Sequence, residues 1–287
     1  MILSMTGYGK AEANLENKKV TIEIKSLNSK QIDMNFRMPS SLREKELISR
    51  QKISSHLKRG KIDVSIFVEF TGVQKTVSLN KELIKSYYQE LKEISSEMET
   101  KENLMGIIMR MPEVLKQEKE SIDEKEWLNI DKLLDQAITN LNQFREDEGQ
   151  VLQKDFAARI HTIKTLLIEV EGVEKQRIDK IKSRLKEKID ALQVEVDPNR
   201  LEQEIIFYIE KLDINEEVVR LANHLDYFIE NLKTDSSQGK KLGFICQEIG
   251  REVNTMGSKS NDAKMQQIVV QMKDELEKIK EQILNVL

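Results

Sequence analysis

The stretch KIDVSIFVEF at residues 61–70 alternates apolar and polar side chains, with one exception at Phe67. A period of two is typical of a β-strand with one buried face. KVTIEIK at 19–25 and QIDMNFRM at 31–38 follow the same pattern. Residues 4–13 (SMTGYGKAEA) are a further candidate strand, with a turn expected around Asn14–Asn17. Together these stretches predict a small sheet at the start of the chain.

A helix is expected between the last two strands. Pro39-Ser40-Ser41 would begin it and Gly60 would end it. Its apolar face would comprise Leu42, Leu47, Ile48, Ile53 and Leu57. Helices packed on one face of an antiparallel sheet form an α+β layer. We therefore expect the α+β class, with a small antiparallel-sheet domain at residues 1–120.

Helical signals dominate the middle of the chain. Residues 80–97 are expected to form a helix, and Pro112 a short connection. Residues 121–196 are rich in charged side chains and contain no proline. This composition predicts a long, solvent-facing helical hairpin arm, with breaks near Gly149 and Gly172.

The remaining residues, 197–287, predict an all-α domain. Asp197 and Pro198 fit the N-cap and first position of a helix. Apolar side chains then recur at helical spacing on three helices: Val218, Leu221, Leu225, Phe228 and Leu232; Leu242, Ile245, Ile249, Val253 and Met256; Met265, Ile268, Met272, Leu276, Ile279 and Ile283. The last stripe is close to a heptad pattern, which indicates either core or an oligomer seam.

The charge of the chain is unevenly distributed. The net charge is -4, which argues against a generic nucleic-acid coat. Residues 1–75 nevertheless carry 14 Lys/Arg against 8 Asp/Glu, and the rest of the chain carries 32 against 42. A basic part beside an acidic part could join a polyanion-binding surface to a carboxylate-rich site. Ordinary surface variation is the alternative.

Composition also bears on compartment and assembly. Cys246 is the single cysteine, so an intrachain disulfide is excluded and a reducing compartment is favoured. Residues 1–7 lack the basic start of a secretory signal, and no apolar run is long enough to cross a membrane. We expect a cytoplasmic protein. Its helices have thin apolar stripes and only 5% aromatic residues, which favours oligomerisation.

Common nucleotide-binding, metalloprotease and serine-hydrolase signatures are absent, and one Cys with three His argues against a Cys/His zinc site. A polar group stands out instead. Asp213, Glu217, Arg220 and His224 are spaced by four, three and four residues, so they would share one helix face. Glu248 and Glu252, with Arg251 beside them, are four apart on the next helix. Facing helices with carboxylates and one imidazole suit Mg²⁺ or Mn²⁺.

Structural interpretations of the same residues stay open. Asp213 and Glu216 also fit a capping box. Glu248 and Glu252 could be an exposed face paired with Arg251 or nearby lysines. His224 could be an interface histidine.

Further candidate residues could bind phosphate groups. Residues 257–261 (GSKSN) could offer backbone amides at a helix N-terminus, with charge from Lys259. The alternative is a plain turn between helices with Ser260 as N-cap. Arg37, Arg59 and Lys61 flank strand ends, where they could contact an RNA backbone or simply be solvated.

These residues resemble the YicC/YloC family. The N-terminal resemblance rests on SMTGYG at 4–9, EIKSLNSKQIDMNFRMP at 23–39 and RGK at 59–61. The C-terminal resemblance rests on NRLEQE at 199–204 and on the motif residues from Asp213 to Ser260. The polar motif positions are Glu202, Glu204, Asp213, Glu216, Glu217, Arg220, His224, Glu248, Arg251, Glu252 and Lys259.

The resemblance implies a bacterial endoribonuclease that needs Mn²⁺ or Mg²⁺ and assembles as a ring-like homo-oligomer, a hexamer. We expect RNA hydrolysis by metal-activated water. The expected metal ligands are Asp213, Glu217, His224, Glu248 and Glu252, and the expected catalytic residues are His224, Glu217, Glu248 and Glu252. The expected RNA-binding residues are Arg37, Arg59, Lys61, Arg200, Arg220, Arg251 and Lys259.

Two rival functions use the same features differently. A non-catalytic, oligomeric RNA-binding adaptor would share the basic half and the phosphate contacts, but it would not need the carboxylates to bind an ion. A purely structural helical scaffold would leave the polar motifs unexplained.

Overall fold

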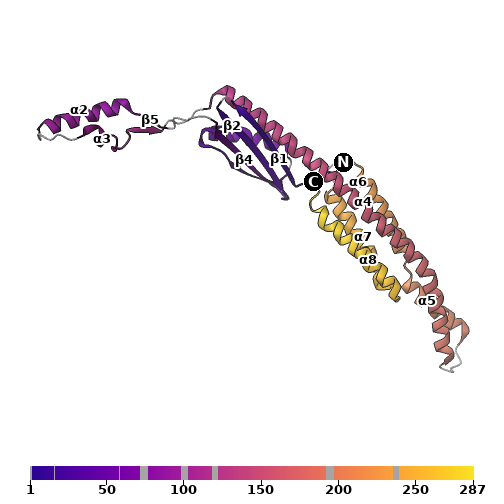
Figure 1. Ribbon diagram of the computed structural model, residues 1–287. Helices are drawn as coiled ribbons and strands as arrows, with labels where there is room; N and C mark the ends of the chain where they lie inside the picture. Colours follow the sequence, from indigo (N-terminus) through magenta and orange to yellow (C-terminus); the bar gives the residue numbers. More distant parts are fainter. Residues whose placement is uncertain are drawn as a thin grey trace.

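The computed structural model describes residues 2–15, 17–57, 59–71, 77–97, 103–117, 122–191, 197–234 and 239–287. Its N-terminal layer is a four-stranded sheet with the order β1-β2-β4-β3. The strands are β1 (Gly7–Leu15), β2 (Lys18–Leu27), β3 (Ile32–Arg37) and β4 (Gly60–Phe70). With the long helices that follow (Figure 1), this sheet confirms the α+β class.

The sheet is mixed, so the expectation of a purely antiparallel sheet is wrong. The β1–β2 and β2–β4 pairs are antiparallel, but β3 and β4 are parallel. The cause is the connection between them, a 3₁₀ turn (Ser40–Lys45) followed by α1 (Glu46–His56). A helical crossover returns the chain to the edge where β3 began, so β4 runs in the same direction.

One face of the sheet is covered by helices. α4 (Glu124–Ala191) contacts β1 and β2, and α1 contacts β3 and α4. The alternation in β2 and β4 directs every second side chain into this layer. The fully buried members from the sheet and α1 are Val20, Ile22, Ile24, Ile53, Ile62 and Val64. They pack against the apolar stripe of the first part of α4.

The expected hairpin arm is instead one helix. α4 has 68 residues and runs without interruption through Gly149 and Gly172, so both expected breaks are wrong. A glycine costs a helix only about 1 kcal/mol, which packing along the helix easily offsets. At Gly149 the missing side chain is needed, because a Cβ there would lie 2.0 Å from the carbonyl oxygen of Ile2. The expected boundaries at 120/121 and 196/197 stay a prediction.

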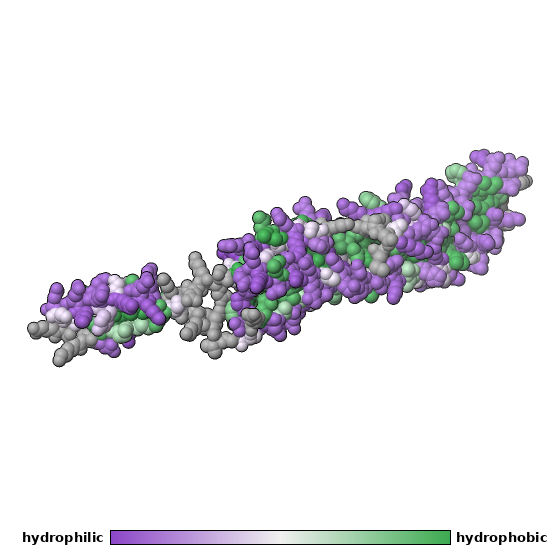
Figure 2. Space-filling view, turned by 90° about the horizontal axis from the view of Figure 1, so that it is seen from above, coloured by the Kyte–Doolittle hydropathy of each residue, from purple (hydrophilic) through white to green (hydrophobic). Residues whose placement is uncertain are grey.

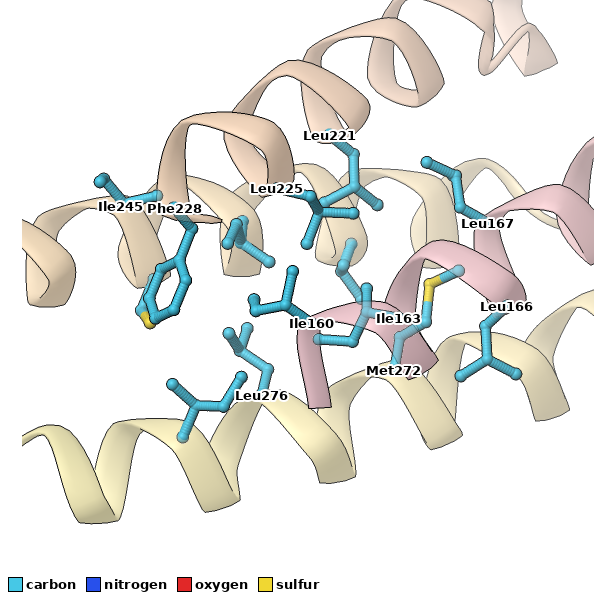
Figure 3. Close-up of a cluster of buried hydrophobic side chains, with 14 of the residues drawn as sticks. Ile160, Ile163, Leu166, Leu167, Leu221, Leu225, Phe228, Ile245, Met272 and Leu276 are labelled. Atoms are coloured by element: carbon cyan, nitrogen blue, oxygen red, sulfur yellow. The ribbon is translucent and has the colours of Figure 1, made fainter. Parts of the chain in front are cut away.

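The second part of α4 packs on α6 (Asn215–Leu232) and α8 (Ala263–Ile283), and α7 (Gly239–Lys259) packs on both of these to complete a four-helix core. Figure 3 shows Leu225 and Phe228 of α6 directed toward Ile160 of α4 and Leu276 of α8. The α8 stripe lies in this core, from Met265 to Ile283. Another helix, α5 (Pro198–Leu212), extends beyond the bundle (Figure 1) and begins as expected with Asp197 as N-cap.

The two ends of the described chain meet between the sheet and the bundle (Figure 1). The amide of Met5 donates to the carbonyl of Asn285 at 2.7 Å, and the amide of Leu287 donates to the carbonyl of Leu3 at 2.9 Å. The guanidinium of Arg145, on α4, donates to the carbonyl of Met5. Burial lowers the pKa of Arg145 to about 10. The motif at residues 4–9 is therefore part of this junction.

A small unit projects from the far end of the sheet (Figure 1). It contains β5 (Val77–Leu79), α2 (Lys81–Glu97), α3 (Leu104–Ile108) and β6 (Leu115–Gln117). The helix expected at 80–97 is confirmed by α2. The antiparallel β5–β6 pair was not predicted, because three-residue strands are too short to show a period.

The face of the molecule drawn in Figure 2 is largely hydrophilic. Figure 2 shows hydrophobic residues in patches along the molecule, including the α2–α3 unit, the sheet and the end near α5. Among the described residues, no helix combines the length and apolar character that a membrane crossing requires.

The close approach at Gly149 can be tested within α4. We expect Gly149→Ala to lower the free energy of unfolding by about 1–3 kcal/mol or more, because the new methyl group overlaps the backbone of Ile2. Thermal and urea unfolding would measure the change.

Gly172→Ala is the matched control, since a Cβ there meets nothing within 4 Å. We expect it to stabilise the protein by about 0.5–1 kcal/mol through helix propensity alone. Equal effects of the two substitutions would contradict the packing argument.

Candidate functional site

The expected polar residues lie mainly on α6 and α7, which pack side by side. Asp213 follows α5 and is exposed. Its carboxylate accepts from the amide of Asn215 at 3.1 Å, as a capping side chain would. The N-cap residue is Ile214, however, so the capping box of Asp213 with Glu216 is not formed. Asp213 therefore keeps a carboxylate at the surface beside the start of α6.

Glu217 is buried near the start of α6, with 4% of the residue exposed. Its Oε1 lies 2.8 Å from the Nζ of Lys259, the last residue of α7. Its Oε2 is buried and has no hydrogen-bond partner. A buried carboxylate with an unsatisfied oxygen is energetically costly. Such groups are candidates for function.

The ion pair between Glu217 and Lys259 also shows how the antiparallel helices α6 and α7 are aligned with each other. His224 lies seven residues after Glu217 on α6, and Glu252 lies seven residues before Lys259 on α7. Seven residues correspond to about 10.5 Å along a helix. His224 and Glu252 are therefore level with each other, two turns from the ion pair. Glu252 is also buried, with 4% exposed. We call Glu217, His224, Glu252 and Lys259 the seam group.

Exposed charges flank the seam group on both helices. Arg220 pairs with Glu216 on α6, and Arg251 lies 3.9 Å from Glu248 on α7. All four side chains are largely solvent-accessible. Exposed pairs contribute little to stability. The two guanidinium groups can therefore exchange these partners for an anion at little cost.

Residues 257–261 form neither the expected phosphate-binding helix N-terminus nor the expected turn with Ser260 as N-cap. α7 continues through Lys259, so the amides of Gly257 and Ser258 lie inside a helix. The N-cap of α8 is Asp262 rather than Ser260, and its carboxylate accepts from the amides of Lys264 and Met265. Ser260 instead donates to the carbonyl of Met256. The amides expected to meet a phosphate thus have partners within the chain.

Arg177 on α4 was missed by the sequence interpretation. It is 3% exposed and donates to the carbonyls of Leu212 (2.6 Å) and Lys259 (3.0 Å). Its guanidinium is also paired with Glu174. It thus joins the ends of α5 and α7 to α4. The available signal was its place seven residues after Val170, at a core position of the apolar stripe.

The remaining candidates lie apart from the seam group. Arg200, Glu202 and Glu204 are exposed on α5. Arg37 and Lys61 are exposed on the sheet, on the other side of the chain junction (Figure 1). The guanidinium of Arg59 donates to the sulfur of Met5 and to the carbonyl of Val286. Glu217 is separated from Leu232, the last residue of α6, by 15 residues, or about 22 Å along the helix, and the junction lies beyond that end. One chain therefore does not gather all the expected RNA contacts in one place.

The seam group does not by itself supply the ligands that a divalent ion needs. Within the described ranges, no three His, Cys, Asp or Glu side chains lie close enough together to hold a metal ion on their own. Mg²⁺ usually keeps several waters and binds one or two carboxylates plus substrate phosphates. The unsatisfied Oε2 of Glu217 is one such oxygen. Further ligands would come from water, RNA or a second chain.

Comparisons with known proteins cover both parts of the chain. Residues 2–154 match the family described as "Endoribonuclease YicC-like, N-terminal region", and residues 170–287 match "Endoribonuclease YicC-like, C-terminal". A protein of Clostridioides difficile (strain 630), named probable endoribonuclease YicC, is 33% identical over 294 residues, covering all of both chains. A protein of Haemophilus influenzae with the same name is 31% identical and covers 99% of each chain.

Arg177→Met tests the anchoring of the seam group. We expect the free energy of unfolding to fall by about 2–5 kcal/mol, because two carbonyls and Glu174 lose a buried cationic partner. Chemical denaturation would measure the loss. Arg184→Met, at an exposed position of the same helix, should change stability by less than about 0.5 kcal/mol. If Arg177→Met also changed the free energy of unfolding by less than about 0.5 kcal/mol, the anchoring role of Arg177 would be contradicted.

Proposed function

The chain belongs to the YicC-like endoribonuclease family, and we propose that it cleaves RNA internally at the seam group with the help of a divalent ion. The proposal combines the family membership with the chemistry of α6 and α7. It assigns the reaction to the C-terminal bundle and the guidance of RNA to the basic N-terminal part.

The observation that carries this placement is the burial of two carboxylates. Glu217 and Glu252 are each 4% exposed, on two helices that pack together. Burying a carboxylate costs several kcal/mol unless it is paired and hydrogen-bonded. Apolar residues at these two positions would stabilise the helical bundle more than carboxylates do. A catalytic or ion-binding role explains why carboxylates are there.

Glu217 would hold the ion through its unsatisfied Oε2, and most of the other ligands would be water, RNA oxygens or side chains of a second chain. Glu252 and His224 lie about two helical turns from Glu217, so within one chain they would act on the attacking water or the leaving oxygen, with His224 as a proton carrier. An imidazole can take or give a proton in hydrolysis. Asp213 lies at the surface about one turn before Glu217, and Glu248 lies at the surface about one turn beyond Glu252, so the two carboxylates would take part at opposite ends of the site. The bound ion would supply charge stabilisation at the phosphodiester and an activated water.

Arg220 and Arg251 would hold phosphate oxygens of the bound RNA. Each is more than half exposed, and its ion-pair partner within the described part of the chain is a carboxylate of its own helix. A guanidinium can bind two phosphate oxygens at once. Arg200 on α5, and Arg37, Arg59 and Lys61 on the sheet, would extend the RNA contact away from the reaction.

We propose that the active form is a homo-oligomeric ring, a hexamer, in the cytoplasm. α5 contacts α4, and it leaves Ile206, Phe207 and Tyr208 exposed, Phe207 by 67%. Exposed apolar patches commonly mark protein interfaces. A neighbouring chain on α5 would cover these side chains and bring further ligands and RNA contacts to the seam group.

Cleavage of a labelled RNA by the purified protein tests the function. We expect cleavage with Mn²⁺ or Mg²⁺ and none with EDTA. Glu248→Gln should lower the rate by about 10²-fold or more while assembly, measured by light scattering, is unchanged. Glu281→Gln, at an exposed position of α8, is the control and should cleave as the unmodified protein does.

Three results would count against parts of the proposal. Wild-type rates in Glu248→Gln would remove that residue from the site. RNA binding without cleavage under every condition would favour the adaptor function. Cleavage that survives EDTA would mean that the carboxylates act without a metal or serve only structure.

A further inference from the structure

The small unit that projects from the sheet buries few apolar side chains within itself. Among its described side chains, only Ile108 and Val114 are buried. Many large apolar side chains stay exposed instead: Leu79, Tyr88, Ile94, Met105, Ile107, Met109 and Leu115. Folded units of about 40 residues or fewer usually need a disulfide, a metal or another chain. The single cysteine lies on α7, and the described residues hold no group of three His, Cys, Asp or Glu that could bind a metal. A second protein surface is therefore the available support.

The charges of α2 are divided between two sides of the helix. Its exposed residues Lys81, Lys85, Tyr88 and Lys92 are spaced by four, three and four residues, so they share one face. Three of the four glutamates of the helix lie toward the opposite side: Glu90, Glu93 and Glu97. The exposed aromatic ring of Tyr88 is therefore bordered by positive charge.

An open cavity of about 290 Å³ lies beside Tyr88. Its lining consists of Ile84, Lys85, Tyr88 and Gln89 of α2 and Met105 of α3. A cavity with this lining fits an apolar or aromatic side chain better than a charged one. We call the three lysines and the cavity residues the α2 face.

α5 has complementary properties at the opposite end of the molecule (Figures 1 and 2). Ile206, Phe207 and Tyr208 are 50%, 67% and 41% exposed, and we call them the α5 patch. Residues 197–213 carry five Asp/Glu against two Lys/Arg. Glu202 and Glu210 each lie one turn from Ile206. The α5 patch therefore offers aromatic side chains bordered by negative charge, where the α2 face offers a cavity bordered by positive charge.

We propose that the α2 face of one chain binds the α5 patch of a second copy, with Phe207 in the cavity beside Tyr88. The two surfaces lie at opposite ends of one chain, so they meet only between chains. Such a head-to-tail contact repeats from copy to copy and closes into a ring when the rotation allows it. Opposite charges around the contact would select this pairing over contacts between like surfaces.

The inference rests on the proposed function in one respect, that the active form is a ring. It adds which two surfaces form the ring. It also bears on the site, because α5 leads directly into Asp213 and the start of α6. The N-terminal unit of a second copy, bound on α5, would lie near the seam group. RNA contacts that one chain keeps apart could then be supplied by two chains.

The experiment uses two full-length variants, each with one side of the contact blocked. Tyr88→Glu places a carboxylate opposite the acidic α5, and Phe207→Lys places an ammonium opposite the lysines of α2. Light scattering without RNA should find each variant alone as a monomer, because each keeps only one half of the contact. A mixture of the two should form a dimer of twice that mass, since one chain keeps its α5 patch and the other its α2 face.

Glu93→Lys, which changes a charge on the other side of α2, is the control and should assemble as the unmodified protein does. An oligomer of unmodified size in either blocked variant, or a mixture that stays monomeric, would overturn the proposal. So would a dimer of one variant alone, which would mean that like surfaces pair.

Two further measurements separate this contact from other roles. If Tyr88→Glu assembles normally and loses RNA affinity instead, the α2 face is an RNA surface and the proposal is wrong. RNA cleavage by the unmodified protein is measured independently. Cleavage together with unchanged assembly of both blocked variants would overturn this contact and leave the proposed reaction intact.

Discussion

The packing of one 68-residue helix, α4, against two different layers is the interaction on which the fold depends. Its first part covers the sheet, and its second part completes the core of α6, α7 and α8. Neither layer has another covering helix of this length among the described residues. Where α4 passes from the sheet to the bundle, Gly149 allows the backbone of Ile2 to lie against the helix. In the same region, Arg145 donates a hydrogen bond to the carbonyl of Met5. The positions of sheet and bundle thus follow from contacts along a single helix.

The same helix also positions the candidate site. Arg177 lies on the buried stripe of α4 and holds the last carbonyl of α7 and the last carbonyl of α5. These two carbonyls belong to helix ends, where backbone acceptors lack partners within the helix. A buried guanidinium satisfies both, so the start of α6 and the end of α7 are fixed beside each other. Glu217 and Lys259 meet because of this arrangement.

Much of the fold was predictable from side-chain periodicity, and the exceptions have physical reasons. The pattern at 31–38 predicted β3, but a period of two is the same for parallel and antiparallel strands. The helix before β4 was the available signal for a parallel pair. Gly149 was interpreted as a break because sequence does not show what a helix packs against. Ser260 and Asp262 are both good capping residues, and only the hydrogen bonds distinguish them. For the site, spacing placed Glu217 and His224 on one helix. The burial of Glu217 and Glu252 and the anchoring by Arg177 depend on tertiary packing.

The meeting of the two chain ends has a consequence for how the protein forms. Ser4 pairs with Val286, and Leu287 donates to Leu3, so these contacts join residues separated by almost the whole sequence. Their loop-closure entropy is the largest in the molecule. During synthesis, β1 and its neighbours leave the ribosome long before residues 285–287 exist. The sheet can therefore assemble early, while the junction that aligns it with the bundle must wait for the final residues of this sequence.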